Sequence, residues 1–317
     1  MLWGAPLAAQ RGPVPFPAIV ASGRVIRIGA ADSAPAAGVR VVLHYLGRSR
    51  RAPLDSVLTD AAGRFRFRFP ADTTALHIVT ARHAGIQYFA EPLSANPSRP
   101  DTAVVLVVHD TSSAAPVSLE ARHIVLSAPA GDGSRSVVEL LSIRNDGPLA
   151  RVSPDSAAAT WSMRIPARAI GFAVSDGDLS AGAVDRSDDS VLVRGPIAPG
   201  ARQVSVEYLL PAGIDAAEFP VDAPTTTVNV LVEESGARMV TEGLPADSAT
   251  VIQGRSFQRW TGAMAAGSRV RIELPRPFQA SRWLMAVLVV SFGLVLLAAA
   301  WIALRQPHTL AQREPAS

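Results

Sequence analysis

Hydrophobic and polar residues alternate with a period of two in residues 17–111, and turn-forming residues interrupt the alternation about every eight to twelve positions. This pattern is typical of short antiparallel strands packed as a β-sandwich. The clearest strand is 63–70, in which Phe65, Phe67 and Phe69 alternate with three arginines. Because successive side chains of a strand point to opposite faces, we expect the rings in a core and the arginines in water. Six further strands are predicted at 21–28, 39–46, 55–59, 76–82, 86–90 and 103–109.

A tight turn is predicted directly before the phenylalanine-rich strand. The segment Asp60-Ala-Ala-Gly63 has the composition of a turn, and its glycine supplies the positive φ that a short connection needs. Seven short strands joined in this way favour an immunoglobulin-like sandwich for residues 17–111.

Three segments of this region carry a family resemblance. They are Ser22-Gly-Arg-Val25, Ala37-Gly-Val-Arg-Val-Val-Leu43 and Leu58-Thr-Asp-Ala-Ala-Gly-Arg-Phe-Arg-Phe67. Together they resemble the carboxypeptidase regulatory-like domain, a transthyretin-like sandwich. The resemblance covers roughly ninety residues. It implies an accessory module of the kind appended to enzymes, receptors and surface proteins, sometimes grouped with carbohydrate-binding-like folds, and it brings no active-site residues.

Residues 115–277 form a second region rich in predicted strands. Turn sequences such as Asn145-Asp-Gly147, Pro199-Gly200 and Pro211-Ala-Gly213 separate its apolar runs. A second, larger antiparallel sandwich is therefore expected, and the fold class is all-β. Its strands are predicted at 117–126, 136–144, 160–165, 169–174, 190–193, 203–210, 226–232, 256–261 and 268–274, with a loop at 153–159.

The strongest single signal is the uncharged apolar stretch 283–304, which begins with Trp283 and contains Trp301 near its end. At about 1.5 Å rise per residue its length matches a hydrocarbon core of roughly 30 Å. Interfacial tryptophans and the flanking Arg282 and Arg305 are typical of a single transmembrane helix. Residues 305–317 then form a short cytoplasmic tail, and the membrane is the first predicted partner.

Residues 1–16 are interpreted as the remnant of a secretory signal peptide with a linker, because an apolar stretch is followed by small residues and prolines. A charged n-region is missing, so an ordinary chain terminus is the alternative.

The orientation of the predicted membrane helix is less direct. More arginines precede 283–304 than follow it, and this count alone would place the β-domains in the cytoplasm. Long domains, however, are translocated across the membrane largely regardless of their charge. We therefore expect the β-domains on the extracytoplasmic side of a bacterial cytoplasmic membrane, periplasmic or at the cell surface.

Composition excludes several classes of function. The chain has no cysteine, so disulfides, thiolate metal sites and thiol nucleophiles are ruled out. Thirty cationic residues, all arginine, face 27 acidic residues for a net charge of +3. The arginines are scattered along the predicted strands instead of forming a run, which argues against nucleic-acid binding.

Candidate metal ligands are weakly organised. Five histidines lie in or beside predicted strands without close ligand spacing, and they are read as isolated polar residues: His44, His77, His83, His109 and His123. An acidic stretch offers oxygen ligands for Ca²⁺ only if its loops converge, and solvated hairpin tips are the alternative: Asp176, Asp178, Asp185, Asp188 and Asp189. No cofactor is predicted.

Catalytic motifs are also missing from the sequence. No Gly-x-Ser-x-Gly elbow or phosphate-binding glycine loop is found. Glu233 and Glu234 are adjacent on a predicted strand end, so their side chains should point to opposite faces and cannot act on one bond. No residue is assigned to catalysis, and the ligand-binding residues stay unassigned.

Five aromatic residues are candidates for a sugar-stacking platform, although most are expected in the cores: Tyr45, Tyr88, Trp161, Tyr208 and Trp260. The sequence therefore favours a non-catalytic, membrane-anchored envelope protein whose β-domains bind a protein partner or an envelope polymer. The alternatives are a carbohydrate-binding module and an enzyme with carboxylates on loops of the second domain.

Overall fold

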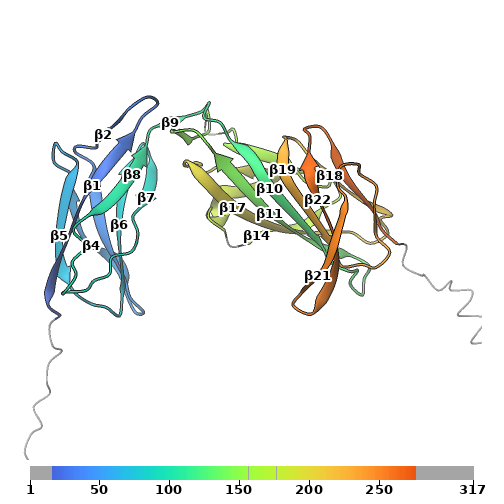
Figure 1. The fold of residues 1–317 in the computed structure, drawn as a ribbon, viewed down its shortest axis with the longest axis horizontal. Helices are drawn as coiled ribbons and strands as arrows, with labels where there is room; N and C mark the ends of the chain where they lie inside the picture. Colours follow the sequence, from blue (N-terminus) through green and yellow to red (C-terminus); the bar gives the residue numbers. More distant parts are fainter. Residues whose placement is uncertain (1–15, 156, 176, 276–317) are drawn as a thin grey trace, which may run out of the picture. The chain divides into compact units, whose positions relative to one another are not determined.

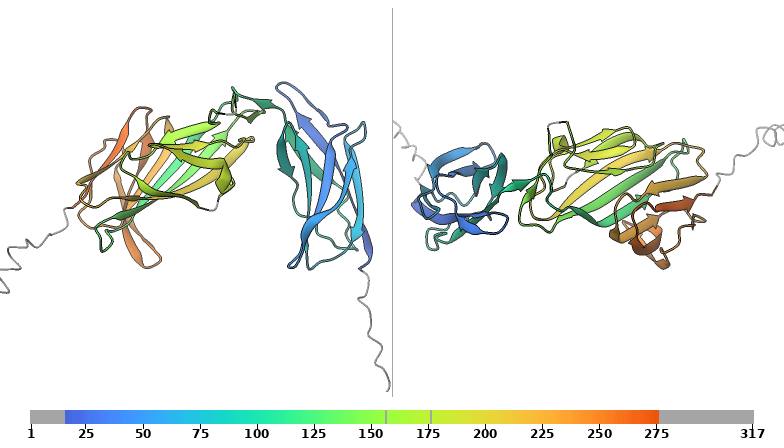
Figure 2. Two further views of the ribbon diagram at one scale, coloured as in Figure 1. Left: turned by 180° about the vertical axis from the view of Figure 1, so that it is seen from behind. Right: turned by 90° about the horizontal axis from the view of Figure 1, so that it is seen from above.

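The computed structural model describes residues 16–155, 157–175 and 177–275, and these residues form an all-β protein (Figures 1 and 2). The one helical element among them is a short 3-10 turn, Ala181–Ala183. The strands of the first sandwich are β1 (Ala18–Ile28), β2 (Ser33–Pro35), β3 (Arg40–Leu46), β4 (Arg51–Leu58), β5 (Arg64–Pro70), β6 (Leu76–His83), β7 (Ile86–Phe89) and β8 (Val104–His109).

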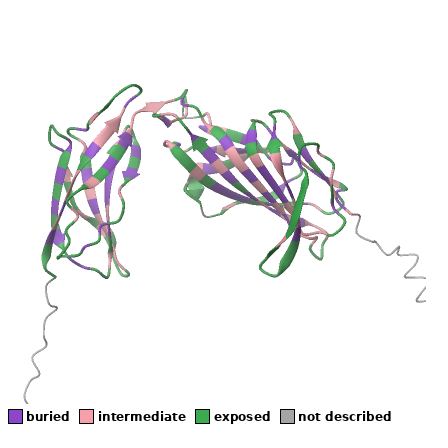
Figure 3. Cartoon of the chain, in the orientation of Figure 1, coloured by how far each residue is buried: buried purple, intermediate pink, exposed green. Residues whose placement is uncertain are grey.

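The first sandwich consists of two four-stranded sheets. In one sheet, β1 pairs in antiparallel fashion with β2 and β5 and in parallel with β8. In the other sheet, the strand order is β4-β3-β6-β7. Phe65, Phe67 and Phe69 are at most 5% exposed and belong to the hydrophobic core, while the arginines between them are exposed. The predicted two-faced strand is therefore confirmed, and Figure 3 shows this alternation of buried and exposed residues along the strands.

Two glycines make the β1 sheet possible. Gly63 has φ of +70°, and a Cβ there would lie 2.5 Å from the carbonyl oxygen of Val25. At Gly23, a Cβ would lie 2.0 Å from the carbonyl oxygen of Val104, because β8 runs directly beside β1. Both positions exclude any larger residue, which explains glycine within a strand and at the predicted turn.

The second sandwich is built on a seven-stranded sheet of order β14-β17-β11-β10-β19-β22-β21. Two three-stranded sheets, β13-β16-β15 and β18-β23-β20, contribute buried residues to the same hydrophobic core. The strands are β10 (Ser118–Leu126), β11 (Arg135–Asn145), β13 (Trp161–Arg164), β14 (Ile170–Ser175), β15 (Val184–Ser187), β16 (Ser190–Val193), β17 (Gly200–Leu210), β18 (Ala216–Pro220), β19 (Thr225–Val232), β20 (Arg238–Met239), β21 (Ala246–Ile252), β22 (Arg255–Met264) and β23 (Arg269–Glu273). The short strands β9 (Thr111–Ser112) and β12 (Ala150–Arg151) pair in parallel.

Several observed strands were not predicted. The strand β21 consists mostly of exposed residues, so it lacks the alternation that identifies a half-buried strand. Strands β2, β9, β12 and β20 have only two or three residues, and β15 and β18 only four or five. Segments of two or three residues give the alternation too few positions to repeat, whereas length alone does not explain β15 and β18, since the four-residue β16 was predicted.

The membrane prediction falls outside the described residues. The apolar stretch 283–304, the tail 305–317 and nearly all of the remnant 1–16 lie in parts of the chain that the structure does not describe. Within the described ranges, no helix has the length and apolar character needed to cross a bilayer.

Candidate functional site

Four arginines lie on one outer surface of the first sandwich, and we call them the arginine face: Arg24, Arg64, Arg66 and Arg68. The antiparallel register of β1 and β5 sets Arg24 directly opposite Arg64 and Ser22 opposite Arg66. All four arginines are exposed. Residues directly opposite on paired strands share a face, so two arginines of like charge occupy neighbouring backbone positions on one surface here.

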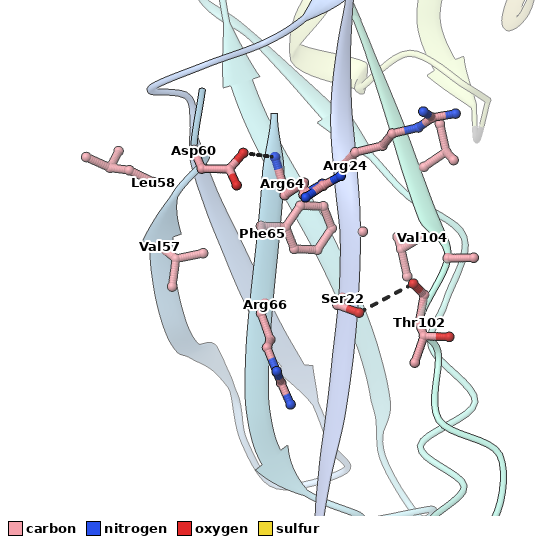
Figure 4. A pocket seen from close by; sticks show the side chains of 13 residues that line it. Ser22, Arg24, Val57, Leu58, Asp60, Arg64, Phe65, Arg66, Thr102 and Val104 are labelled. Atoms are coloured by element: carbon pink, nitrogen blue, oxygen red, sulfur yellow. Dashed lines mark hydrogen bonds between the residues drawn. The ribbon is translucent and has the colours of Figure 1, made fainter. Parts of the chain in front are cut away.

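None of the four guanidinium groups has an acidic partner or a hydrogen bond among the residues that the structure describes. Asp60 also lies on this surface, and one of its oxygens accepts hydrogen bonds from the backbone N–H of Ala62 at 2.9 Å and of Arg64 at 2.8 Å. Figure 4 shows the second of these contacts. The carboxylate therefore stabilises the turn before β5 and forms no ion pair with an arginine side chain. Six other described arginines also have no ion pair or side-chain hydrogen bond, but those of the arginine face lie on two paired strands.

An open groove of about 770 Å³ runs beside these arginines. Figure 4 shows Arg24, Arg64 and Arg66 on its lining together with the hydroxyl-bearing Ser22 and Thr102. The Ser22 hydroxyl donates to the Thr102 carbonyl oxygen at 3.4 Å. The rest of the wall consists of the Asp60 carboxylate and mostly apolar residues, of which Leu58 is 59% exposed. Guanidinium and hydroxyl groups in an open groove are suited to carboxylate, phosphate or sulfate oxygens.

The predicted histidines are separate from one another. His44 Nε2 lies 3.0 Å from the Thr80 hydroxyl, and His83 Nε2 lies 2.7 Å from the Asp110 carboxylate. His109 contacts the carbonyl oxygen of Pro148, and His123 contacts the Asn229 amide. His77 is 1% exposed, and neither of its ring nitrogens has a hydrogen-bond partner.

The acidic candidates do not gather either. Asp176 lies outside the described residues. Asp178 accepts the backbone N–H of Gln203 at 2.8 Å, and Asp185 lies 3.9 Å from Arg194. In the described part of the chain, no three histidines or carboxylates are placed to hold a metal ion.

Glu233 and Glu234 lie just after the end of β19 and not on a strand as predicted, and they contact different partners. Glu233 pairs with Arg255 and accepts the N–H of Ala128 at 2.8 Å. Glu234 forms a two-point ion pair with Arg135 at 2.7 and 2.9 Å. The two carboxylates therefore stabilise separate contacts of the second sandwich.

The candidate aromatic platform is largely buried. Tyr88, Tyr208 and Trp260 belong to the cores, with at most 8% exposed surface. Trp161 and Tyr45 are half-buried, and the Tyr45 hydroxyl donates to Asp72 at 2.8 Å. These five rings do not form an exposed stacking surface.

One cluster of ionisable groups was not predicted from the sequence. Arg122 on β10 forms a two-point ion pair with Glu139 on β11 at 2.6 and 3.1 Å, and the Tyr208 hydroxyl on β17 donates to the same carboxylate. All three side chains are at most 1% exposed. Burial, followed by the charge of Glu139, raises the pKa of Tyr208 well above its usual range. The period-two pattern did contain the signal, since Arg122 is in phase with the buried Ile124.

This buried cluster is not placed for catalysis. Its polar atoms are satisfied by one another and by the Pro220 carbonyl oxygen, which accepts from Arg122. It lies within the core rather than in an open groove. We interpret it as a structural ion pair that fixes the register of three neighbouring strands.

Comparison of the chain with protein-family models and with curated proteins gave no match. The arginine face is therefore the candidate site on geometry alone.

Proposed function

We propose that the protein is a non-catalytic, membrane-anchored envelope protein whose first sandwich binds an anionic polymer through the arginine face. The observation that carries this proposal is the pair Arg24 and Arg64, which lie directly opposite each other and form no ion pair with any carboxylate of the described residues. Like charges directly opposite each other on paired strands repel and destabilise the sheet. A bound anionic ligand relieves this repulsion.

The spacing of the arginines favours a polymer over a small anion. Arg64, Arg66 and Arg68 project from the same face of β5 at alternate positions. Alternate residues of a strand are roughly 6.5–7 Å apart, so the Cα atoms of the three arginines span about 13 Å. A polysaccharide or polyphosphate with repeating anionic groups can engage the row at several points, whereas one small anion reaches one or two.

Two further parts of the proposal come from the sequence. The stretch 283–304 is the anchor that holds both sandwiches on the extracytoplasmic side of the membrane. Residues 17–111 are a carboxypeptidase regulatory-like domain, an assignment that depends on the three segments that resemble this family. A non-catalytic accessory role agrees with both.

The test is binding of an acidic polysaccharide, such as polygalacturonate, by the detergent-solubilised full chain. Replacing Arg64 and Arg66 together by glutamine should weaken binding at least about tenfold, because each charge-assisted contact contributes roughly 1.5–3 kcal/mol. Binding of the unaltered chain should also fall as salt screens the charges.

Two controls keep this test specific. Arg168→Gln removes an exposed arginine of the second sandwich and should leave the affinity unchanged. A neutral polysaccharide of the same length should not bind. Equal binding of the neutral polymer, or full affinity in the Arg64→Gln and Arg66→Gln double variant, would refute the charge-based site.

A further inference from the structure

Several loops of the second sandwich lie at one end of the seven-stranded sheet. The register places Leu126 beside both Val137 and Val232, sets Val232 opposite Gln258, and sets Arg135 opposite Leu210. This end therefore holds the connections 127–134, 211–215 and 233–237 and the turn of the β21–β22 hairpin at 253–254.

The described chain also ends at this place. The backbone N–H of Leu274 donates to the carbonyl oxygen of Asp215 at 2.9 Å, and β23 pairs with β18 from Glu273 and Ala216 onward. Asp215 belongs to the connection that follows β17. The chain thus leaves the second sandwich at the same end as the hairpin turn.

The β21–β22 hairpin projects beyond its neighbours at this end (Figure 1). Strand β22 pairs with β19 only from Gln258 onward, so its first three residues pair with β21 alone. Near the tip, Val251 is 70% exposed and Ile252 is 42% exposed. As consecutive strand residues they point to opposite faces, and the sandwich covers neither of them fully.

Two of the carboxylates beside the hairpin form ion pairs, and a third, Asp132, is charged and hydrogen-bonded. Glu233 pairs with Arg255 at the base of the tip, and Glu234 pairs with the buried Arg135. Asp132 accepts two hydrogen bonds from Ser134. An exposed apolar tip on an edge strand, next to paired charges, has a low desolvation cost when it enters an apolar environment.

We propose that Val251 and Ile252 insert into the lipid interface beside the anchor, so that the β21–β22 hairpin is a membrane-contacting tip. The inference depends on the proposed function for the anchor at 283–304. Trp283 follows Pro275 by eight positions, and eight residues span at most roughly 28 Å. If 283–304 is the anchor, Pro275, at the end of the sandwich that carries the hairpin, is therefore at most that far from the start of the membrane segment.

Lipid is favoured over a protein partner because the tip is narrow. A stable protein interface buries about 800 Å² on each partner, which two side chains on opposite faces of a hairpin cannot supply. A pair of β-branched apolar side chains is instead suited to shallow burial among lipid headgroups and the first acyl carbons.

Because the chain contains no cysteine, a single introduced thiol can be labelled at one chosen position. The full chain would carry Ile252→Cys, labelled with bimane, in vesicles of phosphatidylcholine and phosphatidylglycerol whose acyl chains bear a nitroxide quencher. The matched control is Ala246→Cys, an exposed position at the other end of the same strand, about 20 Å away at 3.3 Å per residue.

Quenching at position 252 should exceed quenching at position 246 at least threefold. If the protein floats with the vesicles and the two positions are quenched equally, the hairpin contact is refuted while the anchor stands. If the protein does not float with the vesicles, the anchor fails and the hairpin inference fails with it.

Discussion

At the scale of single residues, His77 shows how burial sets ionisation in the first sandwich. Its imidazole contacts the rings of Phe69 and Tyr45, with centroid separations of 4.9 and 5.5 Å, and is 1% exposed. Burial lowers the pKa of His77, and the nearby Asp72 carboxylate opposes that effect only in part. The folded sandwich therefore keeps this side chain neutral below the pH at which a free histidine is protonated.

This buried histidine predicts that the first sandwich loses stability in mild acid. An unfolded histidine has a pKa of about 6.5, whereas the pKa of the folded His77 lies below that value. As pH falls below the unfolded value, the unfolded state takes up the proton first, and the free energy of unfolding falls by up to about 1.4 kcal/mol per pH unit until the folded pKa is reached. Above that window the group has no effect.

Hydrogen exchange of β5 and β6 measures this effect locally, after correction for intrinsic exchange rates. Protection of these amides from exchange should decrease as the pH is lowered from 7.5 to 5.5 in the unaltered chain. The decrease should be smaller in His77→Leu. His44→Gln serves as the control, since His44 lies on the outer face beside Thr80. An identical pH response in His77→Leu would show that another group is responsible.

At the scale of elements, the buried ion pair ties together three neighbouring strands. Arg122, Glu139 and Tyr208 come from β10, β11 and β17, and each partner faces the core. Attraction within a buried pair only roughly offsets the cost of removing both charges from water. Replacing both Arg122 and Glu139 by apolar residues should therefore change the free energy of unfolding little. Replacing only one of them should lower it strongly.

We predict that Glu139→Leu alone destabilises the second sandwich by about 3–5 kcal/mol, because it leaves the Arg122 charge buried without a partner. The double variant Arg122→Met with Glu139→Leu should recover most of that loss. Urea unfolding followed by tryptophan fluorescence suits the measurement, since Trp161 and Trp260 lie in this sandwich and residues 17–111 contain no tryptophan. Equal losses in the single and double variants would contradict the ion-pair interpretation.

The elements also show what a sequence pattern can and cannot predict. Strand β5 was predicted in full because three phenylalanines alternate with three arginines, and β16 was predicted with its observed bounds. The strand β21 was missed because neither of its faces is consistently buried. The arginine face could not be predicted, since strand pairing, which the local pattern does not specify, brings Arg24 from β1 opposite Arg64.

At the scale of the whole molecule, the described residues form two hydrophobic clusters. The first is built mainly from residues between Ile19 and Val108, with Ala150 added, and the second from residues between Leu119 and Leu274. Because these residues bury an extensive apolar surface among themselves, we expect them to fold without the apolar stretch 283–304, which makes the proposed anchor testable by truncation.

A chain ending at Pro275 should fold, remain monomeric by light scattering and keep the far-ultraviolet circular dichroism of β-sheet. It should no longer float with lipid vesicles, because the hairpin tip alone buries too little apolar surface for stable attachment. Its affinity for the acidic polysaccharide should stay within about twofold of that of the full chain, since the proposed binding site consists of residues on β1 and β5. Persistent flotation would mean that the sandwiches themselves bind lipid strongly. A tenfold loss of polysaccharide affinity would mean that the membrane segment takes part in the binding site, and the arginine face would then be only part of it.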